Sequence, residues 1–218
     1  FRRSRGLGDV YKRQSVDGVT YSFPVGGISM VVGVDTDLST AFTGACSYSA
    51  FTDYMSDCGT VNSIGSAGNG FTAAGSYAFS SGFSLAGAIS GTADGEDTDA
   101  NKVGLLTKEG SDSYGIEAAY TADSWGVSVA YVYDDNNTSA ETTTWGINGS
   151  YTFDSEGLPT VSVGYETEET SGTDKTGYFV GLTWPEVGPG SVSVGAATSA
   201  NYASSATEYM IYEASYSY

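Results

Sequence analysis

The chain has 218 residues, with 26 acidic side chains, eight basic ones and no histidine, and its formal net charge is −18. This length accommodates one large all-β domain or two small ones. The negative charge excludes nucleic acid as a partner, because phosphates would be repelled. The lack of histidine excludes serine–histidine and cysteine–histidine catalytic pairs, and no apolar run reaches the roughly 20 residues of a transmembrane helix. We therefore predict that the protein is not an enzyme and has no cofactor.

Residues 1–14 differ from the rest of the chain. They hold five of the eight basic residues: Arg2, Arg3, Arg5, Lys12 and Arg13. The string DVYKRQ at 9–14 resembles the in-frame translation of a transposase end sequence used in DNA library preparation, and a natural basic arm is the alternative. We expect residues 1–14 to be a non-native, disordered segment, so that no signal peptide is visible. Residues 15–218 then form the β domain, with three lysines and no arginine.

From residue 16 onward, apolar and small polar residues alternate with period two, which predicts β-strands. Between Trp125 and Tyr133 every second residue is Trp, Val or Tyr, and the residues between them are Gly, Ser, Ala and Val. Similar runs lie near 19–23, 28–35, 70–80, 83–91, 113–121, 145–153, 160–167, 176–184, 191–198 and 208–218. The chain therefore predicts about eleven strands of roughly 8–12 residues, a length that crosses a bilayer when the strand is tilted.

The connections between these strands are expected to alternate in length. The short ones fall at 24–27, 80–82, 122–124, 154–158 and 185–190, and the long ones at 36–69, 92–112, 134–142, 168–175 and 199–207. Outer-membrane barrels have short periplasmic turns and longer loops outside. We therefore predict an all-β fold, an antiparallel up-and-down transmembrane β-barrel in which each strand pairs with the next.

Aromatic residues gather near both ends of the predicted strands, as expected for the two membrane–water interfaces. The predicted girdle comprises Phe23, Phe79, Trp125, Tyr133, Trp145, Phe153, Tyr178 and Trp184. Between its two rows, the same face carries mainly aliphatic residues. We expect this face to point outward, with Val127, Val129, Ile147, Tyr151, Val163, Val180 and Leu182 on it.

The opposite face is formed mainly by Gly, Ala, Ser and Thr, with few charges. A soluble β-sandwich, the alternative fold, would have a wet face rich in charged residues. Small polar residues instead suit the wet interior of a barrel. The candidate pore-lining residues are Asp35, Glu117, Ser128, Asn148, Ser150, Ser162, Glu166 and Thr183.

Two further sets of residues suggest sites in the loops. Cys46 and Cys58 lie in a Gly/Ser/Thr-rich stretch, where a disulfide suits an oxidising compartment and two free thiols are the alternative. The string ADGEDTDA has alternating oxygen ligands of the kind that bind Ca²⁺, and its acidic residues are Asp94, Glu96, Asp97 and Asp99. A solvated loop surface is the alternative for these acids, and a glycosidase-like carboxylate pair also stays open.

Four stretches together resemble the cyanobacterial branch of the carbohydrate-selective (OprB-like) porins. They are YSFPVGG at 21–27, YGIEAAYTADSWGVSVAYVY at 114–133, GLPTVSVGYETEETSGTDKTGYFVGLTWPEV at 157–187 and EYMIYEASYSY at 208–218. The resemblance covers most of residues 15–218 and is one of pattern. It implies a barrel of about sixteen strands, of which this chain would supply about eleven and be incomplete at both ends.

Two classes of function follow from these observations. The first is an outer-membrane porin, a passive channel for carbohydrates, ions and other small hydrophilic solutes, whose selectivity follows the charge of the pore. The second is a non-conducting barrel that anchors, adheres or binds through its long loops. The expected partners are outer-membrane lipid and small solutes, with a homotrimer as the candidate assembly. The loop at 36–69 is the longest and is expected to fold into the pore, and the acidic charge predicts a preference for cations.

Overall fold

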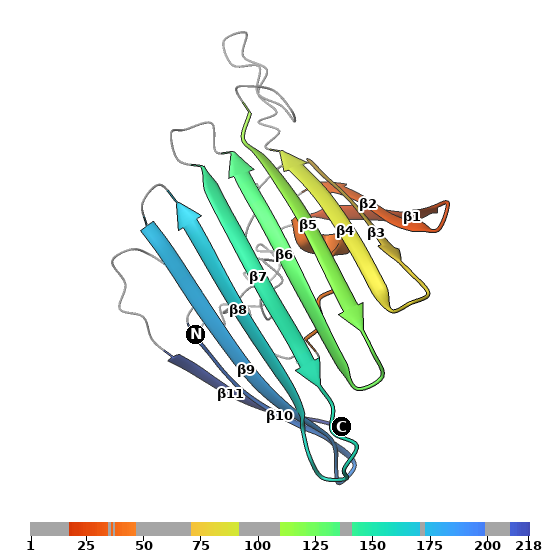
Figure 1. Ribbon diagram of the computed structural model, residues 1–218, viewed down its shortest axis with the longest axis vertical. Coiled ribbons are helices and arrows are strands. Elements are labelled where there is room, and N and C mark those ends of the chain that lie inside the picture. The colour runs from red at the N-terminus through yellow and green to blue at the C-terminus, as the bar shows by residue number, and fades with distance from the viewer. Residues whose placement is uncertain are drawn as a thin grey trace, which may run out of the picture.

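The computed structural model describes residues 18–34, 36, 38–46, 71–91, 110–135, 141–170, 173–198 and 210–218. These residues form one antiparallel sheet of 11 strands, in which each strand pairs with its neighbours in the sequence. Figure 1 shows the strands side by side and tilted, with β1 and β11 at the two edges of the sheet. The up-and-down order excludes the Greek-key crossings of a β-sandwich.

The strands have the following bounds: β1 (Val19–Val25), β2 (Ile28–Val34), β3 (Phe71–Ala78), β4 (Phe83–Gly91), β5 (Asp112–Thr121), β6 (Trp125–Asp135), β7 (Thr142–Tyr151), β8 (Thr160–Thr170), β9 (Thr173–Val187), β10 (Gly190–Thr198) and β11 (Met210–Ser217). The described residues also include one short 3₁₀-helix, η2 (Leu38–Ala41). Within this part of the chain, no helix has both the length and the apolar composition needed to cross a membrane.

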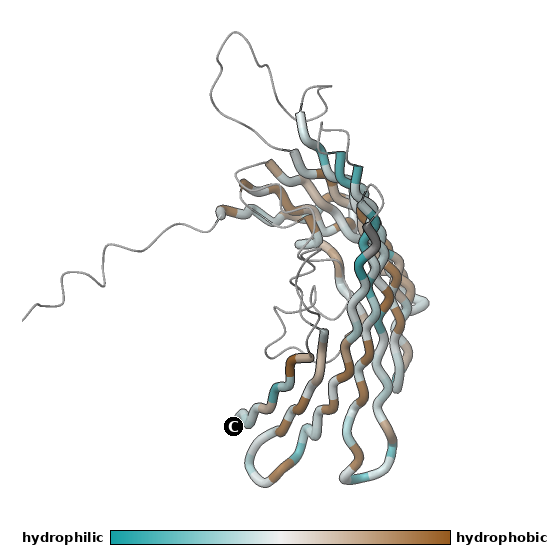
Figure 2. The backbone as a smooth tube through the Cα atoms, turned by 90° about the vertical axis from the view of Figure 1, so that its left-hand side faces the viewer, coloured by the Kyte–Doolittle hydropathy of each residue, from teal (hydrophilic) through white to brown (hydrophobic). Residues whose placement is uncertain are grey.

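The sheet curves into a C-shaped wall with a convex and a concave face (Figure 2). Burial alternates along the central strands, because successive side chains point to opposite faces. In β6, for example, Val129 is 39% exposed, whereas its neighbours Ser128 and Ala130 are each 1% exposed. The concave face is therefore lined mainly by small residues, and most of the larger apolar residues cover the convex one.

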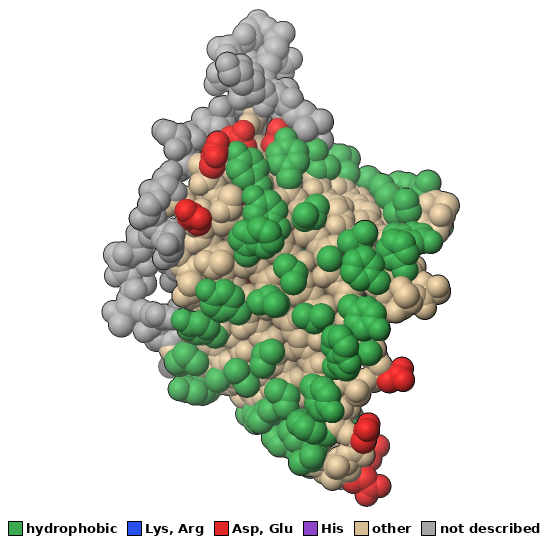
Figure 3. Space-filling model, viewed as in Figure 1, with side chains coloured by type: hydrophobic (Ala, Val, Ile, Leu, Met, Phe, Trp, Pro, Cys, Tyr) green, Lys and Arg blue, Asp and Glu red, His purple; other side chains and the backbone are tan. Residues whose placement is uncertain are grey.

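The convex face bears most of the exposed apolar side chains (Figure 3). The predicted outward residues lie there: Val129, Ile147, Tyr151, Val163 and Val180 are 39–49% exposed, and Val127 and Leu182 are half-buried. Acidic side chains gather toward the ends of the strands in the same view. An apolar band that faces outward on a curved sheet is typical of the lipid-facing wall of a barrel, and a dry sandwich core would have buried these residues.

The strand boundaries agree with the predicted ones to within a few residues, except around β8 and β9. The sequence predicted a long loop at 168–175, and this prediction is wrong. β8 continues to Thr170 and β9 begins at Thr173, with Glu168 paired to Lys175 in register. Threonines and an ion pair across the two strands favour continued pairing in this polar stretch, which hydrophobic alternation alone does not detect.

Glycines close two of the short turns. Gly26 and Gly27, with φ of 57° and 91°, join β1 to β2 in a two-residue hairpin that requires positive φ at both positions. Gly82, with φ of 84°, lies so close to the Thr121 carbonyl oxygen that no Cβ fits there. The turns on this side of the sheet therefore stay tight, as the sequence predicted for the periplasmic side.

Candidate functional site

A stretch of chain after β2 lies across the concave wall, and we call residues 38–46 the inward segment. Its first part is η2, where Leu38 is fully buried against Ala130 and Val132 of β6, together with Phe42 and Ala88. Gly115 of β5 faces it from the wall, and a Cβ at this position would lie 2.7 Å from Leu38 Cδ2. The small residues of the wall thus leave the space into which the segment packs.

Glu117 of β5 holds the middle of the inward segment. Its Oε2 atom accepts a hydrogen bond from the Thr43 backbone N–H at 2.6 Å and from the Thr43 hydroxyl at 3.4 Å. Its Oε1 atom accepts one from the Gly44 N–H at 2.7 Å. The side chain is 3% exposed, so these bonds stabilise a carboxylate that has little contact with water.

Asn148 of β7 holds the next residue of the segment. Its Oδ1 atom accepts a hydrogen bond from the Ala45 N–H at 2.6 Å. Gly126 lies beside this contact, since a Cβ there would be 3.3 Å from the Ala45 Cβ. Asn148 Nδ2 is buried and has no hydrogen-bond partner within the described ranges.

The two ends of the inward segment are also attached to the wall. Before it, the Thr36 carbonyl accepts a hydrogen bond of 2.7 Å from the Thr72 hydroxyl, which is also 2.9 Å from the Ser90 hydroxyl. At its end, Cys46 packs against the buried pair Phe179 and Ala197 of β9 and β10. The segment therefore crosses the concave face from the N-terminal strands toward the C-terminal ones.

Cys46 is disulfide-bonded. The other cysteine of the chain, Cys58, lies outside the described residues, so the predicted Cys46–Cys58 pairing stays a prediction. The predicted calcium ligands Asp94, Glu96, Asp97 and Asp99 also lie outside them, as does Asp35. Among the described residues, no group of three or more acidic or cysteine side chains could hold a metal ion.

The other candidate pore-lining residues lie on the concave face. Glu117, Ser128, Asn148, Ser162 and Glu166 are 1–3% exposed, and Ser150 and Thr183 are half-buried. The inward segment brings Glu117 and Asn148 together, because it binds both of them. Ser128 Oγ has no hydrogen-bond partner in the part of the chain that the structure describes.

Charged side chains on the concave wall are mainly acidic. Glu168 of β8 accepts a hydrogen bond of 2.7 Å from Lys175 Nζ of β9, which is the only basic residue among those described. Asp134 of β6 accepts a hydrogen bond from the Ser113 hydroxyl. With Glu117 and Glu166, the wall thus carries several carboxylates against one ammonium group.

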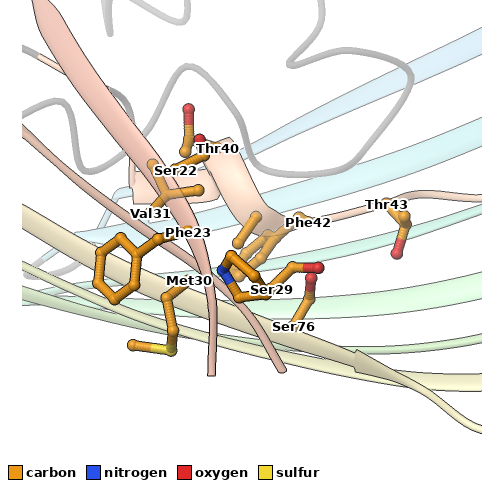
Figure 4. Close-up of a pocket in the computed structure, with 11 residues that line it drawn as sticks. Ser22, Phe23, Ser29, Met30, Val31, Thr40, Phe42, Thr43 and Ser76 are labelled. Carbon is orange, nitrogen blue, oxygen red and sulfur yellow. The ribbon is translucent and has the colours of Figure 1, made fainter. Parts of the chain in front are cut away.

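A cavity of ≈ 430 Å³ lies between the inward segment and strands β1 to β3 (Figure 4). Its lining includes Phe42 and the hydroxyl-bearing residues Ser22, Ser29, Thr40, Thr43 and Ser76. No charged side chain lines it. The rings of Phe23 and Phe42 and the aliphatic residues Pro24, Met30, Val31 and Ala41 complete a mixed lining without charge.

The predicted girdle residues form two groups at opposite ends of the strands. Near the short turns lie Phe23, Phe79, Trp125, Phe153 and Trp184, and near the other end lie Tyr133, Trp145 and Tyr178. Seven of them contact another ring, as in Tyr131–Trp145, whose centroids are 4.5 Å apart, and Tyr120–Trp125, at 5.3 Å. Such paired, half-exposed rings suit the membrane–water interface.

The sequence predicted that Glu117 and Asn148 line the pore, but not which residues they bind. It expected the long loop at 36–69 to fold inward, and the described part of that loop does so. It did not identify Leu38, Thr43 or Gly44 as the contacting residues. The one available signal was glycine at inward-facing positions such as Gly115, where a missing side chain marks a close approach.

No protein-family model matches the chain, and neither does any curated protein. Among solved structures, the chain is similar to the outer membrane channel DcaP of Acinetobacter baumannii, with a TM-score of 0.51 and 8% identity over 90% of this chain. It is also similar to OmpF of Salmonella typhi in complex with daunomycin, with a TM-score of 0.49 and 17% identity over 83% of this chain. The chain spans 60% and 53% of these two proteins, respectively. The similarity to DcaP shows that the chain shares the fold of this outer-membrane channel.

Proposed function

We propose that the chain forms part of the wall of a porin in the bacterial outer membrane, a passive channel for small hydrophilic solutes. The observation that carries this proposal is the division of one curved sheet into two faces. The convex face is apolar and ends in aromatic rings, whereas the concave face carries small polar and acidic side chains. Transmembrane barrels with aqueous channels divide their faces in this way.

The position of the inward segment supports the proposal that the channel has a narrowed passage. A segment that is bonded to the wall at Glu117 and Asn148 occupies space on the concave side without removing the polar lining around it. A passage narrowed in this way selects solutes by size and by the groups that line it. The cavity beside the segment has no charged side chain and combines hydroxyl groups with two phenylalanine rings, a lining that suits uncharged solutes such as carbohydrates.

The charge of the wall supports a preference for cations over anions. Carboxylates such as Glu166 and Asp134 outnumber the single ammonium group of Lys175 on the described concave face. A negative potential at a narrow passage concentrates cations and repels anions. Because the Debye length is about 8 Å at 0.15 M salt, only charges near the passage act on passing ions.

The experiment is conductance of the full-length protein in a planar lipid bilayer. We expect discrete, ohmic conductance steps and, under a KCl gradient, a reversal potential that indicates more permeation by potassium than by chloride. Swelling of vesicles that contain the protein should rank neutral sugars by size. A protein that inserts but carries no current would favour the non-conducting anchor or adhesin, and a preference for chloride would contradict the assigned selectivity.

A further inference from the structure

We propose that Glu117 sets the bore of the channel by anchoring the inward segment, with Asn148 as its second anchor, and that the charge of Glu117 contributes little to ion selectivity. This inference rests on the proposed function, because a bore has meaning only in a conducting protein. It separates Glu117 from Glu166, the other described carboxylate that the sequence predicted to line the pore.

The inward segment donates hydrogen bonds to both oxygens of the Glu117 carboxylate. Each oxygen accepts a backbone N–H, from Thr43 at 2.6 Å and from Gly44 at 2.7 Å, and the Thr43 hydroxyl adds a third donor. Gly44 has φ of 57°, a conformation in which successive N–H groups can converge on one anion. The negative charge is thus compensated by fixed dipoles of the segment.

The two anchors, Glu117 and Asn148, bind three consecutive residues of the inward segment. Asn148 Oδ1 accepts the Ala45 N–H at 2.6 Å, directly after the two N–H groups that Glu117 holds. Glu117 and Asn148 belong to β5 and β7, and β6 between them presents Ala130 and Ser128 in the matching registers. These small residues let the backbone approach the wall, so the segment has a defined distance from it.

Glu168 differs from Glu117 in the residues that it binds. That carboxylate bonds to Lys175 and Thr170, which belong to the wall itself. Glu168 is therefore a matched control: its substitution removes one charge from the same face and leaves the anchor in place. If Glu117 acts through the segment, the two substitutions should change different properties of the channel.

The test compares E117Q and E168Q in the full-length protein. Glutamine keeps the size of the side chain but offers a single acceptor oxygen, and its amide group would face a backbone N–H donor. We expect the Thr43 and Gly44 amides of E117Q to exchange hydrogen faster by on the order of tenfold to a hundredfold, the effect of losing one charge-assisted bond. Single-channel conductance and the size limit for neutral sugars should rise, while the reversal potential stays near the wild-type value.

E168Q should have the opposite effect. Its amide exchange and conductance should equal those of the wild type, whereas its reversal potential should shift. A second anchor variant, Asn148→Leu, should accelerate exchange of the Ala45 amide and widen the bore even if E117Q fails to fold. If the wild-type protein conducts and the anchor variants keep its amide exchange and conductance, the anchoring role is wrong but the proposed function stands. A reversal potential shifted by E117Q at constant conductance would make Glu117 a selectivity residue instead, and a wild-type protein without conductance would overturn the proposed function as well.

Discussion

Gly115 on β5 leaves the space that the side chain of Leu38 occupies on the concave face. A Cβ at position 115 would lie 2.7 Å from Leu38 Cδ2 and 2.9 Å from Phe42 Cζ. Real Cβ atoms do not come this close to a neighbour, so a larger residue at 115 must shift the side chains of Leu38 and Phe42 that pack there.

We therefore expect Gly115→Ala to lower the free energy of unfolding by about 1–3 kcal/mol, as overpacking does in other cores. Denaturant unfolding of the folded protein in detergent measures this change. Gly87→Ala is the control, because the nearest atom to its Cβ, the Gly115 carbonyl oxygen, is 3.8 Å away. Equal stability of the two variants would show that Leu38 does not need the space at Gly115.

A charge in the middle of the convex face should hinder membrane insertion. Ile147 is 45% exposed and lies between the rings of Trp145 and Tyr151 on β7. Ile147→Arg should cost about 2–4 kcal/mol, the penalty for arginine near the bilayer midplane. Folding into lipid vesicles, followed by heat-modifiable gel mobility, measures it.

The matched control for this substitution is Asp123→Arg. Asp123 is an exposed residue of the turn between β5 and β6, where arginine would stay in water. We expect this variant to insert like the wild type. If Ile147→Arg inserts equally well, the convex face does not contact lipid.

The state of the cysteines can be tested by thiol labelling. Because Cys46 is disulfide-bonded and Cys58 is the one other cysteine of the chain, we expect no labelling of the unfolded, unreduced protein and two labels after reduction. Cys58→Ser should expose one reactive thiol without reduction. Two labels on the unreduced wild type would contradict the predicted bridge.

Removing the basic side chain of Lys175 should change both the stability of the protein and its ion selectivity. Lys175 Nζ and Glu168 Oε1 are 2.7 Å apart, and both side chains are partly exposed. Lys175→Met should lower the free energy of unfolding by about 1 kcal/mol and strengthen the preference for cations, since Glu168 loses its counter-charge. A double-mutant cycle with Glu168→Gln measures the coupling, and a cycle without coupling would show that the pair is not formed in solution.

The strands and the direction of their side chains were determined by the sequence alone. In β6 and β7, alternation from Trp125 to Tyr151 distinguishes an apolar face from a small polar one, and a period of two can be read from neighbouring residues. The aromatic ends and most short turns follow from the same local chemistry. At 168–175 the alternation is weak, and the predicted loop is wrong. Paired threonines on β8 and β9 and the ion pair between Glu168 and Lys175 favour continued strand pairing there.

Only the tertiary structure decided what the concave face holds. Glu117 binds Gly44 over a separation of 73 residues, and Asn148 binds Ala45 over 103. No periodicity links such residues, since their contact depends on the curvature of the whole sheet and on the missing side chain at Gly115. The sequence therefore predicted that Glu117 and Glu166 face inward but did not name Glu168 or Asp134, whereas the fold determined that Glu117 binds the backbone of a segment that crosses the wall.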